Sequence, residues 1–165
     1  MRATDEFGEY DVLDMFNPFQ DDQENPTRTD ARHRITVNGT WSPGAGVKIS
    51  PIFRYRSKTP FNVITGVDGN RDGLIWDLPA GVRTLNSGRG ADFAQLDVRV
   101  AKSFALGGRS RIELIGEAFN VFNDTNPTTF VASQTSTLFG RPTRFAGDFR
   151  QTEQRLFQLG LRFEF

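Results

Sequence analysis

The sequence contains no cysteine and only one histidine among its 165 residues. Disulfide bonds, thiolate-bound metals and multi-histidine zinc sites are therefore excluded. Because no catalytic triad can be assembled from these residues either, we expect that the protein is not an enzyme and needs no cofactor. Lys plus Arg and Asp plus Glu each total 20. The chain thus lacks the basic surplus of a nucleic-acid binder, and we expect no nucleic acid among its partners.

Long apolar runs are also missing. No stretch approaches the roughly 18 apolar residues that a membrane-spanning helix needs. Residues 1–16 contain no apolar core of the kind found in signal peptides. The chain is instead rich in Phe and Gly, with 16 of each. This composition favours many strands joined by polar loops over packed helices.

Apolar and polar residues alternate in five segments, which is typical of strands with one apolar face. The clearest case is the final stretch, LFQLGLRFEF, which ends on an aromatic residue. We therefore predict an all-β fold of about five antiparallel amphipathic strands. The expected strands are residues 33–42, 47–58, 93–104, 110–122 and 155–165.

The connections between these strands alternate between short and long. SPGAG and ALGGR are short turns, whereas residues 59–91 and 123–154 form long loops. Transmembrane barrels have this asymmetry, with short periplasmic turns and long extracellular loops. The predicted strand lengths also suit a tilted crossing of the bilayer. On this interpretation residues 1–31 are a truncated extracellular loop.

Aromatic residues near the strand ends fit the girdles that barrels place at the two membrane interfaces. The candidate girdle residues are Trp41, Tyr55 and Phe104, with Phe163 and Phe165 in the last strand. Because the smallest bacterial barrels have about eight strands, five strands cannot close a barrel. We therefore expect an incomplete, open sheet from the C-terminal end of a transmembrane barrel.

Charged residues of both signs occupy the faces opposite the apolar ones. They could form cross-strand ion pairs along a wet wall, or contact a plug domain or substrate path. The sequence favours the first use without excluding the second. The residues are Arg34, Lys48, Arg54, Arg56, Asp97, Arg99, Arg111, Glu113, Glu117, Arg162 and Glu164.

The stretch GVDGNRDGLIWD carries the one candidate metal site. Asp68, Asn70 and Asp72 have the spacing of the first three ligands of an EF-hand loop, and Asp77 could add a fourth. The twelfth position of that loop is Pro79 rather than Glu. Calcium is therefore a minor expectation beside a Gly/Asn/Asp-rich loop with local turns.

Four stretches together resemble a known family. They are DARHRITVNGTW, GVDGNRDGLIWDLPAGVRTLNSGRG, EAFNVFN followed by a long loop with FGRPTR, and the terminal LFQLGLRFEF. In this order they resemble the C-terminal part of TonB-dependent outer-membrane receptors, particularly the Oar-like group with a carboxypeptidase-regulatory-like N-terminal domain. The resemblance covers most of residues 30–165.

This resemblance implies location in the outer membrane of a Gram-negative bacterium and active uptake of a scarce siderophore, vitamin or glycan. The implied partners are outer-membrane lipid, a plug domain and a TonB-type coupling protein, the last two through the N-terminal part. The family also implies that the barrel-assembly machinery reads the terminal strand. Its matching positions are Phe157, Leu159, Leu161, Phe163 and Phe165.

Complete receptors of this family are several times longer, so we expect a fragment that is not transport-competent alone. Two other functions stay open at this point. One is a soluble β-domain that binds sugar or calcium through its long loops. The other is a barrel anchor for surface display, which the strand pattern does not distinguish from a receptor.

Overall fold

The computed structural model describes Phe16, residues 26–147 and residues 154–165, and all regular structure in this part of the chain is β. No helix there has the length and hydropathy to cross a membrane. Most of the predicted loop 1–31 lies outside the described residues. The chain forms two compact units. The strand unit comprises His33–Arg56, Phe93–Asn126 and Ala146–Phe165, and the loop unit comprises Met1–Arg32, Ser57–Asp92 and Pro127–Phe145.

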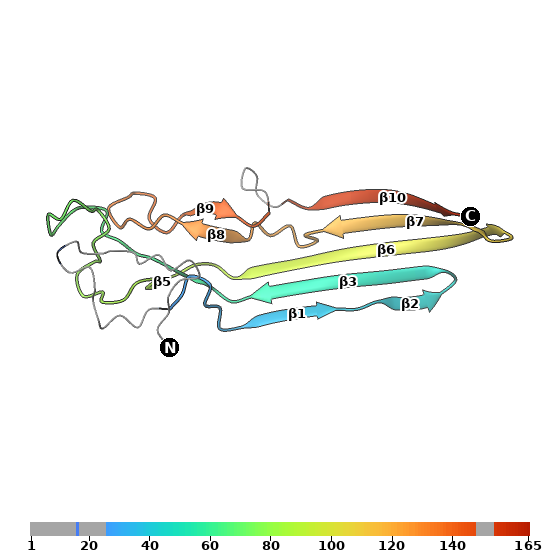
Figure 1. The fold of residues 1–165 in the computed structure, drawn as a ribbon, viewed down its shortest axis with the longest axis horizontal. Coiled ribbons are helices and arrows are strands. Elements are labelled where there is room, and N and C mark those ends of the chain that lie inside the picture. The colour runs from blue at the N-terminus through green and yellow to red at the C-terminus, as the bar shows by residue number, and fades with distance from the viewer. Residues whose placement is uncertain (1–15, 17–25, 148–153) are drawn as a thin grey trace. The chain divides into compact units, whose positions relative to one another are not determined.

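The strand unit is one antiparallel sheet with the order β1-β3-β6-β7-β10, and β2 pairs with the same edge of β3 as β1, in line with it (Figure 1). This arrangement confirms the predicted all-β fold with antiparallel strands in an open sheet. The strands are β1 Arg34–Asn38, β2 Trp41–Gly44, β3 Val47–Arg56, β6 Phe93–Gly107, β7 Ser110–Phe119 and β10 Leu156–Glu164.

Two of the connections within this sheet are tight turns rich in glycine. Gly46 follows β2 with a φ of 73°, and a Cβ at this position would lie 2.6 Å from the carbonyl oxygen of Ser103. Only glycine tolerates both that backbone conformation and that approach. At the other turn Gly107 and Gly108 have φ values of 105° and 60°. Such turns let neighbouring strands pair over their whole length.

The first strand differs from its prediction. Residues 33–42 were expected to form one strand, but the structure has two, with an interruption at Gly39 and Thr40. The register on both sides of the interruption places Gly39 opposite Pro51. Proline has no N–H to donate, so one bond of the ladder cannot form there. β6, in contrast, continues to Gly107, three residues past its expected end.

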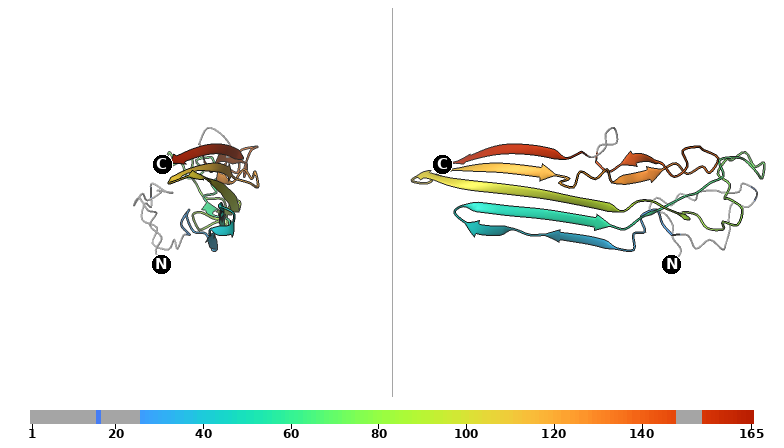
Figure 2. Two further views of the ribbon diagram at one scale, coloured as in Figure 1. Left: turned by 90° about the vertical axis from the view of Figure 1, so that its right-hand side faces the viewer. Right: turned by 180° about the vertical axis from the view of Figure 1, so that it is seen from behind.

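The sheet is curved and has two free edges. The end-on view in Figure 2 shows β1 and β10 at separate ends of an arc of strands. Within the described residues neither β1 nor β10 pairs with a strand on its outer side. The sheet is therefore open, which is a hazard for a soluble protein because free edges recruit other strands.

The loop unit contains short strands that the sequence pattern did not predict. These strands form two small sheets, β4 with β5 and β8 with β9. The phenyl rings of Phe61 and Phe130, one from each sheet, stack at 5.3 Å between centroids. Val63 is buried nearby in sequence. The bounds are β4 Pro60–Phe61, β5 Gly88–Arg89, β8 Pro127–Phe130 and β9 Pro142–Phe145.

The two long loops are joined by main-chain hydrogen bonds inside this unit. Ile64 and Ser133 form a parallel bridge, with Ile64 donating to Ala132 at 3.1 Å and accepting from Gln134 at 2.9 Å. The two long loops therefore share one compact unit.

Candidate functional site

One face of the sheet in the strand unit carries apolar side chains in rows across the strands. One row contains Ile49, Val100, Gly116 and Leu159, and the next contains Val47, Lys102, Leu114 and Leu161. Val100 and Leu114 are exposed, as are Ile35, Val37 and Phe104. The described strands of the strand unit form this one sheet. Such a continuous apolar surface marks contact with a membrane or another protein.

The last strand is the most exposed part of that face. Leu159 is 89% exposed, and Phe157, Leu161 and Phe163 are exposed with it. Phe165 lies just beyond the end of β10, is 93% exposed and stacks on Phe163 with 5.8 Å between ring centroids. The structure therefore places the five residues proposed as an assembly signal on one strand and its end, in an accessible position. Their recognition by an assembly machine stays a prediction.

The girdle candidates lie near the ends of the apolar face. Trp41 and Phe104 lie near the end with the tight turns, where they are 64% and 44% exposed. Tyr55 lies at the opposite end of β3, across from Ala94 on β6, and is half-buried. Aromatic side chains at both ends of an apolar band are the arrangement found at the two interfaces of a bilayer.

Lys102 is the one charged residue in the apolar rows described above. Its Nζ donates a hydrogen bond to the carbonyl of Ala45 in the first tight turn and lies 5.4 Å from the ring centroid of Phe104. The long side chain thus reaches from the apolar rows to the turn, where water or lipid headgroups can solvate it.

Ion pairs cover the opposite face of the same sheet. Arg99 pairs with Glu117 across β6 and β7 at 3.2 Å, and Arg54 pairs with Asp97 across β3 and β6 at 2.9 Å. On the last two strands Arg111 and Arg162 both pair with Glu164 at 2.9 Å. Seven of the eleven charged residues named from the sequence therefore take part in these pairs. A sheet with paired charged side chains on one face and apolar side chains on the other has the two faces of a barrel wall.

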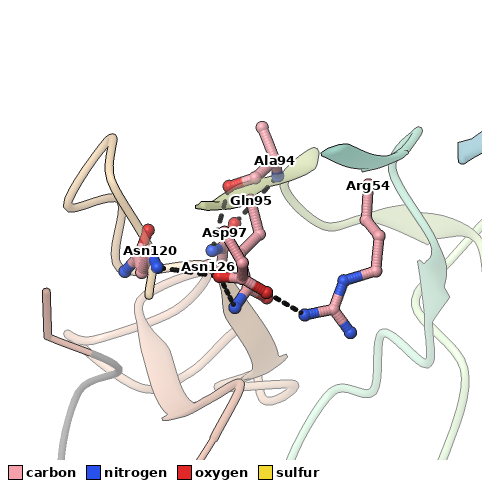
Figure 3. A network of polar contacts seen from close by, with 6 residues as sticks. All are labelled: Arg54, Ala94, Gln95, Asp97, Asn120 and Asn126. Atoms are coloured by element: carbon pink, nitrogen blue, oxygen red, sulfur yellow. Dashed lines mark hydrogen bonds and ion pairs between the residues drawn. The ribbon is translucent and has the colours of Figure 1, made fainter. Parts of the chain in front are cut away.

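A polar network lies at the end of this charged face where the long loops begin (Figure 3). The Asp97 carboxylate accepts hydrogen bonds from Arg54 at 2.9 Å, from Gln95 Nε2 at 3.0 Å and from the Asn120 amide at 2.9 Å. Gln95 is only 5% exposed. The network is satisfied internally, which is what buried polar groups require.

Two asparagines of this network are completely buried. Asn120 and Asn126 are each 0% exposed. The side chain of Asn126 accepts from the Ala94 amide at 2.9 Å and donates to the Ala94 carbonyl at 3.1 Å. Neither residue was predicted from the sequence to be a site residue. The signal that could have found them is the repetition of Asn at 120, 123 and 126 directly after a strand, because Asn is a frequent residue at positive φ.

The candidate calcium residues form a tight loop in which their side chains bind backbone amides. Asp68 accepts from Asp72 and Gly73 at 3.1 and 3.0 Å. Asp77 accepts from Gly69 at 2.6 Å, and Asn70 donates to Asp72 at 3.2 Å. Among the described residues, no three His, Cys, Asp or Glu side chains are grouped so as to hold a metal ion. Calcium binding stays a prediction.

Comparison with known proteins agrees with this geometry. Residues 78–158 match the family described as an outer membrane beta barrel domain. That stretch includes β6, β7 and the start of β10, and every residue of the polar network except Arg54. Neither the curated proteins nor the solved structures gave a match to the chain.

The two-faced open sheet thus defines a β-barrel wall, with one face for lipid and one for a polar interior. The family match places that wall in the outer membrane. The protein is accordingly an outer-membrane protein.

Proposed function

We propose that this wall serves in a TonB-dependent outer-membrane receptor of the Oar-like group, as part of the C-terminal end of its barrel. Such a receptor takes up a scarce ligand of the siderophore, vitamin or glycan class. The plug domain and the coupling protein act through the N-terminal part of the receptor. On this proposal the chain does not transport by itself.

The observation that carries the proposal is the different architecture of the two ends of the sheet. At one end the connections are the tight turns at Gly46 and Gly107–Gly108. At the other end the chain leaves for Ser57–Asp92 and Pro127–Phe145, which fold into a compact unit of their own. A barrel for passive diffusion or display does not need loops with their own hydrophobic contacts, whereas a receptor needs a structured surface for its ligand.

The charged face supports the same proposal. Each of the four ion pairs is at least partly exposed, with Arg side chains 47–63% accessible. Partly exposed Arg and Glu side chains suit contact with a hydrated plug surface, because water and polar groups of the plug can replace the solvation that covering removes. An apolar interior would not suit such a plug.

The test is uptake in cells. The chromosomal gene is deleted, and growth is measured with an iron chelate, cobalamin or a glycan as the limiting nutrient. The proposal expects a deficit for one nutrient, the same deficit when the coupling protein is removed, and no rescue by the 165-residue chain alone. Unchanged growth on all three nutrients would contradict it. The DNA upstream of Met1 provides an independent check, because a receptor requires plug and coupling sequences in the same open frame.

A further inference from the structure

We propose that Asn120, Asn123 and Asn126 form a clasp that isolates the strand unit from changes in the excursion at residues 127–145. The clasp links the loop ends of β6, β7 and β10, and through Asp97 also that of β3, by bonds that are independent of the strand ladders. This inference concerns the barrel wall and applies whichever ligand the protein takes up.

The first bond set of the clasp joins Asn126 to β6. Its side-chain amide pairs with both the N–H and the C=O of Ala94, as a neighbouring strand would. An amide group copies the donor and acceptor of a peptide unit, which no other short side chain except that of Gln does. Because Asn126 is fully buried, loss of this side chain would leave both groups of Ala94 unpaired or reached only by water.

The second bond set joins the end of β7 to β6 and β3. The main chain of Asn120 donates to Asp97, and Asp97 in turn accepts from Arg54 on β3. The Asn120 side chain repeats the pairing geometry of Asn126, since it accepts from the Asp124 amide at 3.2 Å and donates to the Asp124 carbonyl at 2.8 Å. These two hydrogen bonds close the turn from Asn120 to Asp124.

The third bond reaches the last strand. Asn123 Oδ1 accepts from the main-chain amide of Arg155 at 3.0 Å, one residue before β10 begins. The clasp therefore fixes the start of the strand that carries the terminal aromatic residues. The segment 120–126 therefore links β6, β7 and β10 directly, and Asp97 extends this link to Arg54 on β3.

The backbone explains why asparagine occupies all three positions. Asn120, Asn123 and Asn126 have φ values of 49°, 56° and 46°, in the left-handed region. Apart from glycine, Asn is among the residues that enter this region most readily. Glycine would adopt the same backbone but could not supply the side-chain bonds. The N-x-x-N-x-x-N spacing thus combines a tolerated conformation with an amide at each anchor point.

The excursion begins and ends at the clasp. The Asn126 carbonyl accepts a hydrogen bond from the Ala146 amide at 2.9 Å, so the two chain ends of residues 127–145 are tied to each other. A change of conformation within the excursion must break this bond and those of Asn126 before it separates β7 from β6. We infer that the wall stays paired while the excursion rearranges on contact with a ligand.

Hydrogen exchange on the whole chain in detergent micelles tests this inference. A protease site is inserted between Thr135 and Ser136, and amide exchange is compared before and after cleavage. In the otherwise unchanged chain, cleavage should alter exchange in β6, β7 and β10 by less than about twofold. In the Asn120→Gly/Asn126→Gly variant, which keeps the positive φ, cleavage should accelerate exchange at the loop ends of these strands by about tenfold or more.

Three further variants test whether the effect on hydrogen exchange arises from the individual bonds of the clasp. Asn123→Gly should accelerate exchange only at the start of β10. Asn126→Asp keeps the acceptor for the Ala94 amide but loses the donor, so it should give an intermediate effect if the double variant does not fold. Asn38→Gly, on the exposed edge strand β1, should behave as the unchanged chain does. Equal responses of the unchanged chain and the double variant to cleavage, or a tenfold acceleration in the unchanged chain, would overturn the proposal.

Discussion

Leu159 on β10 lies directly opposite Gly116 on β7, and the nearest side-chain atom to a Cβ built on Gly116 is Leu159 Cδ2 at 3.9 Å. Because Gly116 has no side chain, Leu159 packs only against the backbone of its partner residue on β7. Its outer surface is open, although leucine is strongly apolar. Burial of that surface must come from outside the sheet, and we expect outer-membrane lipid to provide it.

This position allows a test of the lipid-facing surface with a matched control. Leu159→Arg places a charge in the apolar band and should destabilise the membrane-inserted state by about 2–4 kcal/mol if the residue lies near the bilayer centre. Gln158→Arg, one residue earlier, points to the opposite face near Glu117 and should be nearly neutral. Urea unfolding in lipid vesicles measures both. Equal destabilisation by the two variants would mean that the face assignment is wrong.

The two tryptophans should report different surroundings. Trp41 belongs to the apolar face and Trp76 to the loop unit, and both are exposed. In vesicles Trp41 should emit at shorter wavelength and be quenched by brominated lipid, because aromatic girdle residues lie at the interface. Trp76 should be quenched by iodide in water instead. Fluorescence of the Trp76→Phe and Trp41→Phe variants separates the two signals, and lipid quenching of Trp76 would contradict the assignment.

The cross-strand ion pairs should contribute little individually. Arg99 is 47% exposed at its side chain, so its pair with Glu117 should stabilise the sheet by about 0.2–1 kcal/mol and less at high salt. Arg99→Glu places like charges opposite each other and should destabilise the sheet by a similar amount. Adding Glu117→Arg to that variant should restore stability. A double-mutant cycle by denaturant unfolding measures the coupling, and its absence would show that the pair is incidental.

The joint between the two long loops depends on Gly66. A Cβ at this position would lie 1.9 Å from Ser133 Oγ, and its φ is 80°. Gly66→Ala should therefore loosen the Ile64–Ser133 bridge and speed proteolysis of both loops, at a cost of about 1–3 kcal/mol. Gly73→Ala is the control, because Gly73 has a similar φ of 91° but nothing within 4 Å. A larger effect at Gly73 would mean that strain alone, and not the contact, controls the unit.

Calcium binding at the GVDGNRDG stretch remains open to a direct test. If Asp68, Asn70, Asp72 and Asp77 bind the ion, their side chains must exchange backbone amides for metal, and the affinity should be in the range of about 10⁻⁴–10⁻³ M that extracellular sites show. Terbium luminescence sensitised by Trp76 is the measurement. Asp72→Asn should abolish the signal and Asp92→Asn should not. Absence of the signal in the unchanged chain at millimolar terbium would show that this stretch does not bind calcium.

The alternation of residues predicted the fold class because lipid and polar interior impose a period of two on every strand. Other features depend on contacts that alternation does not encode. The interruption of the first strand arises from Pro51, which lies in a different strand. The bridge between Ile64 and Ser133 joins residues far apart in sequence. The roles of Asn120 and Asn126 depend on their burial, which the alternation does not encode.

The strict antiparallel pairing of the sheet fixes the relative directions of its two edge strands. Along the path β1-β3-β6-β7-β10 each step reverses the strand direction, so β1 and β10, at the two edges, run the same way. Direct pairing of these edges would be parallel. Any set of strands that closes this sheet into an all-antiparallel barrel must therefore be odd in number, with its first and last strands running opposite to β10 and β1.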